Sequence, residues 1–140
     1  MGEMNSIIYK YSNIYQNIIF LLNECNESDI NKIALFSVLL IRNQRQEKLL
    51  NKNSTFLRDL VRTSINSSIT FFSELERTYE IIDLLYRKDF INVRDGVVTK
   101  KDISNEKSEL ILSNTFKQRL LKCIEETSAI SILNEVINYV

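Results

Sequence analysis

Apolar residues recur at every third or fourth position along most of the chain, a spacing that places them on one face of an α-helix. In chain order, the pattern predicts helices over Ile7–Cys25, Asp29 to about Asn43, Thr55–Thr63, a long stretch with periodic positions from Ile69 to Tyr86, Thr115–Glu126 and Ala129–Asn138. In the last helix, we expect Ile130, Leu133 and Ile137 to face inward. The chain is therefore expected to be mainly α-helical.

The second predicted helix is expected to lie at the centre of the fold. Its segment Ile33–Ile41 is apolar most of the way round, and a helix with so little polar surface is typically buried. Ser28 is the expected N-cap, because a serine hydroxyl can accept a hydrogen bond from the free N–H groups of a first helical turn. Gln44–Asn53 is predicted to be a polar connection, and Ser54 is expected to cap the short helix after it.

The long helix passes directly into a predicted β-hairpin. Strand-like Phe90–Val93 follows it, and Val97–Thr99 returns after Asp95-Gly96. Asp-Gly is a preferred pair for the two positive-φ positions of a tight hairpin turn. Small polar residues in the first half of the long helix also predict a kink or split near Thr78-Tyr79. We predict a single domain over residues 1–140, a mainly α, winged-helix-like helical domain with one small β-hairpin and two C-terminal helices.

The composition is that expected of a bacterial cytoplasmic protein. The 140 residues include 18 basic and 18 acidic side chains, so no overall field attracts nucleic acid or a membrane. Abundant Ile, Asn and Lys without Pro is usual for AT-rich bacterial genes. The longest apolar run, Ile33–Ile41, is far shorter than the ~20 residues that span a bilayer. Cys25 and Cys123 are expected to be buried reduced thiols rather than a disulfide.

No catalytic constellation is present in the sequence. The absence of histidine excludes Ser-His and Cys-His catalysis and the usual His-containing zinc sites, and no glycine-rich phosphate loop occurs. Glu76, Glu80 and Asp83 share one helical face and could bind a divalent cation, but the same spacing is typical of a solvated face. We therefore expect a protein that is not an enzyme, with no cofactor, no metal and no small-molecule ligand.

Basic residues concentrate in the connection with its short helix, and around the hairpin. The candidate partner or DNA-backbone surface comprises Arg42, Arg45, Lys48, Lys52, Arg58, Arg62, Arg94, Lys100 and Lys101. These side chains could contact phosphates. The long helix before a wing would enter the DNA groove, however, and its polar positions include Glu74, Glu76, Glu80 and Asp83. We therefore expect an acidic protein partner at the Arg42–Arg62 segment rather than at the wing, with DNA-backbone contact as an auxiliary role.

Several segments resemble one family in the same order. Phe71–Leu85, followed by the hairpin Phe90–Thr99, resembles the middle component of ABC-three-component systems, the small subunit of Lamassu-type bacterial anti-phage defence complexes. The apolar helix Ile33–Ile41 with the basic Arg42–Arg45 after it, the short helix at Ser54–Leu60, and the closing helices at Leu120–Leu133 agree with the same family. The resemblance covers about Tyr11 to Val136.

This resemblance implies a non-enzymatic subunit. In such complexes an SMC- or Rad50-like coiled-coil ATPase senses aberrant DNA and controls an effector, commonly a nuclease. The small subunit is expected to bridge the ATPase heads and the effector and to restrain the effector until aberrant DNA is sensed. A winged-helix DNA-binding regulator is the alternative function, and an enzyme with a carboxylate-bound metal at Glu76, Glu80 and Asp83 is a third.

Overall fold

The computed structural model of the protein describes residues 2–25, 27–41, 56–65, 68–101, 108, 110 and 112–139, with residues 2–11 and 68–69 described by their backbone alone. Its elements are, in chain order, α1 (Gly2–Cys25), β1 (Glu27–Asp29), α2 (Ile30–Leu40), α3 (Phe56–Ser64), α4 (Ser68–Arg87), β2 (Ile91–Arg94), β3 (Val97–Lys100), α5 (Asn114–Glu126) and α6 (Ala129–Tyr139). The predicted mainly α fold with a small hairpin and two C-terminal helices is confirmed. Helix α1 starts at Gly2, earlier than the predicted Ile7. The predicted connection Gln44–Asn53 and its Ser54 cap lie outside the described residues.

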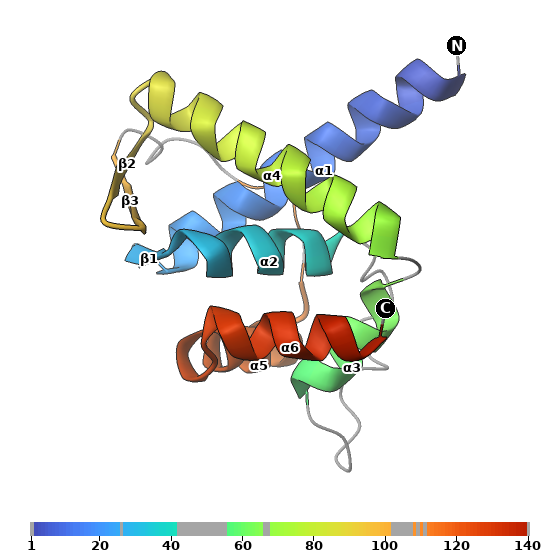
Figure 1. The fold of residues 1–140 in the computed structure, drawn as a ribbon. Coiled ribbons are helices and arrows are strands. Elements are labelled where there is room, and N and C mark those ends of the chain that lie inside the picture. The colour runs from blue at the N-terminus through green and yellow to red at the C-terminus, as the bar shows by residue number, and fades with distance from the viewer. Residues whose placement is uncertain are drawn as a thin grey trace.

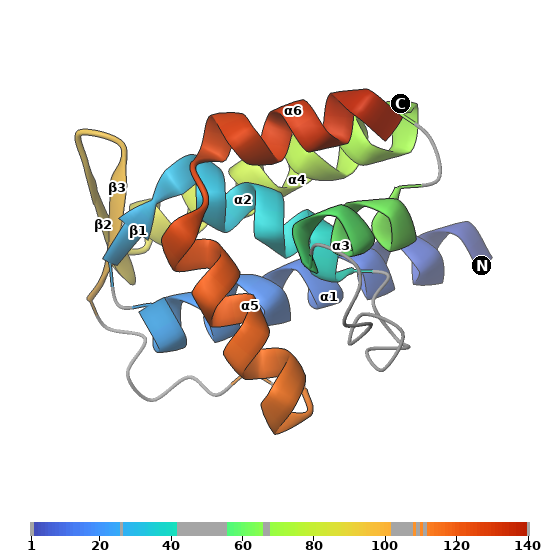
Figure 2. The same cartoon turned by 90° about the horizontal axis from the view of Figure 1, so that it is seen from below.

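The helices form two layers with α2 between them (Figure 1). Helices α1 and α4 pack on one side of α2, and the sheet extends that layer at one end. Helices α3 and α6 pack on the other side, with α5 against α3. Figure 2 shows the same arrangement from below, with the sheet and α3 at opposite ends of the molecule.

A three-stranded antiparallel sheet joins the predicted hairpin to a strand that the sequence did not predict. Its order is β1-β3-β2, and Glu27–Asp29 of β1 pair with Val97–Thr99 of β3. Strand β1 is short and polar, so it carries no alternating apolar pattern from which a strand could be predicted. A helix, a strand, further helices and a hairpin follow one another as in a winged helix, and α4 directly precedes the wing.

The wing turn has the predicted conformation. Asp95 has φ 54° and Gly96 has φ 78°, the two positive values of a type I′ turn. The Gly96 carbonyl also accepts a hydrogen bond from the Ile30 N–H at 2.8 Å. The tip of the wing is therefore held against the start of α2.

The chain leaves α4 through a Schellman motif. Asp89 has φ 66°, its N–H bonds the Tyr86 carbonyl at 3.1 Å, and the Phe90 N–H bonds the Leu85 carbonyl at 3.0 Å. Helix α4 runs unbroken to this motif, so the kink or split predicted near Thr78-Tyr79 is wrong. The Thr78 hydroxyl is buried and donates to the Glu74 carbonyl at 2.8 Å, which satisfies it within a continuous helix.

Helix α2 is the central helix that its apolar sequence predicted, since every residue from Ile33 to Leu40 is buried. Its N-cap is Asp29, not the predicted Ser28. The Asp29 carboxylate accepts from the Asn31 N–H at 2.7 Å and the Lys32 N–H at 3.4 Å. Ser28 is instead a strand residue that pairs with Val98. The unpredicted strand thus moves the start of the helix by one residue.

The buried C-terminal turn of α2 receives polar partners from both layers. The last carbonyls of a helix have no intrahelical donor. Asn17 of α1 donates its Nδ2 to the Ser37 carbonyl at 2.9 Å, and Ser64 of α3 donates its Oγ to the Leu39 carbonyl at 2.5 Å. The Ile41 N–H donates to the Val38 carbonyl at 3.1 Å. These bonds allow the end of α2 to be buried.

The second layer packs through apolar side chains. Phe56 of α3 meets Phe116 of α5, with 5.4 Å between ring centroids, and Ser128 caps α6 as predicted by accepting from the Ser131 N–H at 3.2 Å. The inward face predicted for α6 is wrong. Ile132 and Val136 are buried, whereas Ile130 is 72% exposed and Ile137 54% exposed. Both helical faces are apolar, and packing against α2 and α3 selects one of them.

Candidate protein-interaction surfaces

The predicted basic segment Arg42–Arg62 is described only at its α3 end. Arg42, Arg45, Lys48 and Lys52 lie outside the described residues. Arg58 and Arg62 are exposed on α3. The Arg62 guanidinium donates to the Tyr139 hydroxyl at 3.3 Å and lies 5.7 Å from the centre of that ring. Arg62 therefore helps to hold α6 against α3.

The basic residues of the wing lie far from α3. The sheet lies at one end of the fold in both views and α3 lies towards the other (Figures 1 and 2), so the described cations of α3, Arg58 and Arg62, do not share a continuous face with those of the wing. Arg94 is exposed. Lys101 pairs with Asp89 at 2.7 Å, and Lys100 reaches the Asn23 side-chain oxygen at 3.5 Å. Two of the three wing cations are thus engaged within the fold.

Helix α4 occupies the place of a DNA-reading helix, directly before the wing. Glu76, Glu80 and Asp83 are exposed on it. Glu80 pairs with Arg77 at 3.3 Å and Asp83 with Arg87 at 2.9 Å. Such exposed pairs contribute little stability.

Glu74 was predicted among the outward polar positions of this helix, and that prediction is wrong. Its side chain is buried, with 6% of its surface exposed. The buried face of α4 includes Phe71, Thr78 and Leu85 in the same rows, so Glu74 faces the core side of the helix. Polar character alone could not distinguish Glu74 from its exposed neighbour Glu76.

An aromatic edge runs along α4 beside these carboxylates, and sequence reasoning gave it no functional role. Phe72 is 43% exposed and Tyr86 is 49% exposed, and half-buried Tyr79 lies midway between them. The Tyr79 hydroxyl donates to the Asn31 side-chain oxygen. Burial, and then the charge of Asp29, raises the pKa of Tyr79, so the phenol remains a neutral donor. The seven-residue spacing was a signal that could have identified this edge.

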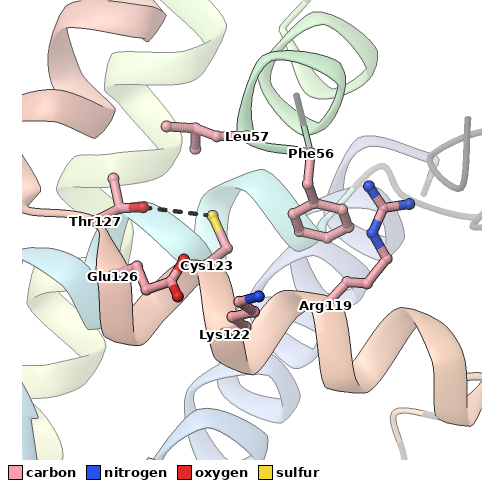
Figure 3. Close-up of a pocket in the computed structure, with 7 residues that line it drawn as sticks. All are labelled: Phe56, Leu57, Arg119, Lys122, Cys123, Glu126 and Thr127. Atoms are coloured by element: carbon pink, nitrogen blue, oxygen red, sulfur yellow. Dashed lines mark hydrogen bonds between the residues drawn. The ribbon is translucent and has the colours of Figure 1, made fainter. Parts of the chain in front are cut away.

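A hollow lies between α3 and α5 (Figure 3). It has a volume of about 370 Å³ and is lined by Phe56, Leu57, Arg119, Lys122, Cys123, Glu126 and Thr127. The Arg119 guanidinium lies 5.1 Å from the centre of the Phe56 ring. The Cys123 sulfur is 3.7 Å from the Thr127 hydroxyl, at the same end of the hollow as Glu126 in Figure 3. The opening thus combines an aromatic ring, cations and one thiol.

The described thiols are poor nucleophiles. Cys25 and Cys123 are free and half-buried, and burial raises the pKa of each. Nearby Glu24 raises the pKa of Cys25 further. A thiol with a raised pKa stays protonated near neutral pH, and the thiolate is the reactive form. Within the described ranges, no three His, Cys, Asp or Glu side chains are grouped so that they could hold a metal ion.

Comparisons of the chain with known protein families, with curated proteins and with solved structures gave no match. Across the described part of the chain, no helix is both long enough and apolar enough to cross a bilayer. On the outward side of α4, exposed carboxylates and aromatic rings lie side by side.

Proposed function

We propose that the protein is a non-catalytic adaptor subunit of a bacterial cytoplasmic defence complex. It bridges an SMC- or Rad50-like coiled-coil ATPase and a nuclease-type effector and restrains the effector until aberrant DNA is sensed. The family resemblance of Phe71–Leu85 and the hairpin suggests the type of complex. The geometry of the chain supports the adaptor role within it.

The observation that carries the proposal is the outward surface of α4. In a DNA-reading winged helix this surface meets phosphates, which carboxylates such as Glu76 and Asp83 would repel. Large exposed aromatic side chains such as Tyr86 are instead characteristic of protein interfaces. The chemistry of α4 therefore favours a protein partner over DNA.

A winged-helix DNA-binding regulator is the second candidate. The exposed Arg94 at the wing favours it, because a wing cation can contact the DNA backbone. Arg58 is exposed as well, but it lies at the opposite end of the fold. A DNA duplex that lies along α4 and contacts Arg94 would also bring its phosphates close to the α4 carboxylates, which would repel them.

Purification of the tagged protein from its native host tests the proposal. We expect a coiled-coil ATPase and an effector to co-purify. A protein that purifies alone and protects a specific operator fragment would overturn the adaptor and establish the regulator.

Charge-reversal variants in the same co-purification distinguish which of the two basic segments, Arg42–Arg62 or the wing, binds the partner. The triple variant Arg42→Glu/Arg45→Glu/Arg58→Glu is expected to abolish assembly with its helical circular-dichroism signal intact. Arg94→Glu is the matched wing variant. Unchanged assembly of the triple variant, with loss in Arg94→Glu, would move the partner to the wing.

The isolated protein is also expected to lack ATPase and nuclease turnover. Glu76 and Glu80 are two of the three carboxylates, with Asp83, that a metal-dependent enzyme would use on α4. Turnover that survives purification and disappears in Glu76→Ala/Glu80→Ala would establish an enzyme instead.

A further inference from the structure

A shallow groove of about 340 Å³ lies where α4 meets the start of α2 and the wing. It is lined by Ile30, Tyr79, Ile82, Asp83, Tyr86 and Val93. Five of these side chains are apolar or aromatic, and Asp83 is the one charged group. The bond from the Tyr79 hydroxyl to Asn31 ties the middle of α4 to α2. The groove wall is thereby fixed in place by neighbouring elements.

The aromatic edge continues this groove along α4. Phe72, Tyr79 and Tyr86 recur every seven residues, as positions of a heptad seam do, with half-buried Leu75 and buried Ile82 between them. Successive edge residues are about 10 Å apart along the helix axis, since each residue rises 1.5 Å. This repeat matches the apolar seam of another helix. Same-face side chains of an extended strand recur at only about 7 Å and do not match it.

Negative charge borders the edge on its open side. Glu76 follows Phe72 by four residues and Asp83 follows Tyr79 by four, so each carboxylate lies beside an edge residue. Asp29 adds a third carboxylate near Tyr79. Arg87 is the cation paired with Asp83, and both partners are more than half exposed, so a cation from a partner could compete for the carboxylate.

From this juxtaposition we propose that the α4 groove binds an amphipathic helix whose apolar heptad seam is flanked by Lys or Arg. The inference rests on the proposed adaptor function and specifies the chemistry of the segment that the partner presents. Duplex DNA does not fit, because its phosphates would meet Glu76 and Asp83. A second copy of α4 does not fit either, because its own carboxylates would face them.

Two labelled peptides, each mixed with the full chain, test whether the groove prefers a helix with Lys or Arg beside its apolar seam. Both peptides carry Leu at the a and d positions of three heptads, and the e and g positions hold Lys in one and Glu in the other. We expect the lysine peptide to bind at least about tenfold more tightly in fluorescence anisotropy, and to lose affinity as salt is raised. Equal affinities, no binding, or tighter binding of duplex DNA would overturn the proposal.

Variants on one helix test the location. Tyr86→Ser and Phe72→Ser are expected to weaken lysine-peptide binding about tenfold or more, because buried interface aromatics dominate affinity. Leu84→Ser is the matched control, since Leu84 is 51% exposed but lies two residues, and so about 200°, around α4 from Tyr86. Equal loss in Leu84→Ser would overturn the groove assignment, as would a dimer of the wild-type chain that Tyr86→Ser dissociates.

Charge reversal provides a test that does not depend on the aromatic variants folding. Glu76→Lys/Asp83→Lys alters exposed side chains and is expected to invert the preference toward the glutamate peptide. Glu125→Lys is the control, because Glu125 is an exposed residue of α5, and it should leave the preference unchanged. An unchanged preference in the double variant would overturn the proposal.

The peptide experiment tests the groove and the co-purification tests the adaptor function, so either proposal can fail while the other stands. If the lysine peptide binds but no coiled-coil ATPase co-purifies, the proposed complex is wrong and the groove stands. If the complex is recovered and Tyr86→Ser leaves it intact, the adaptor function stands and the groove is not its docking site.

Discussion

The two layers bury their apolar faces on the same helix, α2, but expose different surfaces. In the layer of α1, α4 and the sheet, Phe72 and Tyr86 stand beside carboxylates. In the layer of α3, α5 and α6, the outward helix α6 exposes Ile130 and Ile137, and Glu135 is its one charged residue. The first surface therefore combines aromatic rings with carboxylates, whereas the outward face of α6 combines apolar side chains with few charges.

The layers also differ in how they are held. Backbone hydrogen bonds fix the first layer through the sheet, the wing turn and the Schellman motif at Asp89. Side chains hold the second layer to the rest of the fold. Lys32 donates to the Ile124 carbonyl at the end of α5 at 2.8 Å, and Lys117 pairs with Glu24 of α1 at 2.8 Å. Directional backbone bonds define the orientation of α4 against the wing, and with it the shape of the groove.

Truncation of Phe36 would break both layers at once, with the largest expected effect. Phe36 is fully buried in α2, and Phe36→Ala should cost about 3–5 kcal/mol of unfolding free energy. Because α2 supports both layers, hydrogen exchange should show comparable loss of protection in α1 and α6. Loss confined to α6 would contradict the shared role of α2. Phe36→Leu is the milder variant if the alanine variant does not fold.

Truncation of Phe116 should separate the layers. Phe116 is fully buried in α5 against Phe56, and Phe116→Ala is again expected to cost about 3–5 kcal/mol. Here we expect hydrogen exchange to rise more in α5 and α6 than in α1. Equal loss throughout would show that the two layers unfold as one cooperative unit.

The two polar contacts to the end of α2 allow a matched comparison of the layers. Asn17→Ala removes the side-chain donor to the Ser37 carbonyl, and Ser64→Ala removes a hydroxyl that lies within hydrogen-bond distance of both the Leu39 and Leu60 carbonyls; each should cost about 1–3 kcal/mol in chemical denaturation. Thr63→Ala is the control, because Thr63 bonds the Asp59 carbonyl from an exposed position. An equal cost for Thr63→Ala would show that burial of the acceptor is not what matters.

Gly96→Ala should affect the first layer alone, by about 1 kcal/mol. A Cβ at this position meets no atom within 4 Å, so the cost comes from the positive φ of 78°. Thermal unfolding gives the stability, and exchange at β3 locates the effect. A neutral result would mean that the turn relaxes to another type when Gly96 is replaced.

Alkaline pH should produce the smallest effect. Burial raises the pKa of Cys25 and Cys123 above the unfolded value, so the unfolded chain releases these protons first as pH rises. Their contribution to stability is complete below the unfolded pKa of 9.0 and is lost as pH rises through the folded pKa. Denaturant midpoints between about pH 8 and 10 should fall less steeply in Cys25→Ala/Cys123→Ala. Identical slopes would contradict the raised pKa values.

The sequence by itself determined the features that depend on near neighbours. The segment Ile33–Ile41 is apolar most of the way round, which predicted a central helix, and the Asp95-Gly96 pair predicted a turn with positive φ. Ser128 caps α6 by bonding the N–H of Ser131, only three residues away. Each of these features depends on residues within a few positions of one another, so a short stretch of sequence is enough to predict it.

Tertiary structure decided the features that depend on residues distant in sequence. Strand β1 exists because Val97–Thr99 arrive to pair with it, and that pairing makes Asp29 rather than Ser28 the cap of α2. Helix α6 had two apolar faces, and only packing against α2 and α3 chose Ile132 over Ile130. The α4 groove likewise needs Ile30 and Val93 beside Tyr86, a juxtaposition that no local pattern contains, because three separate segments supply its walls.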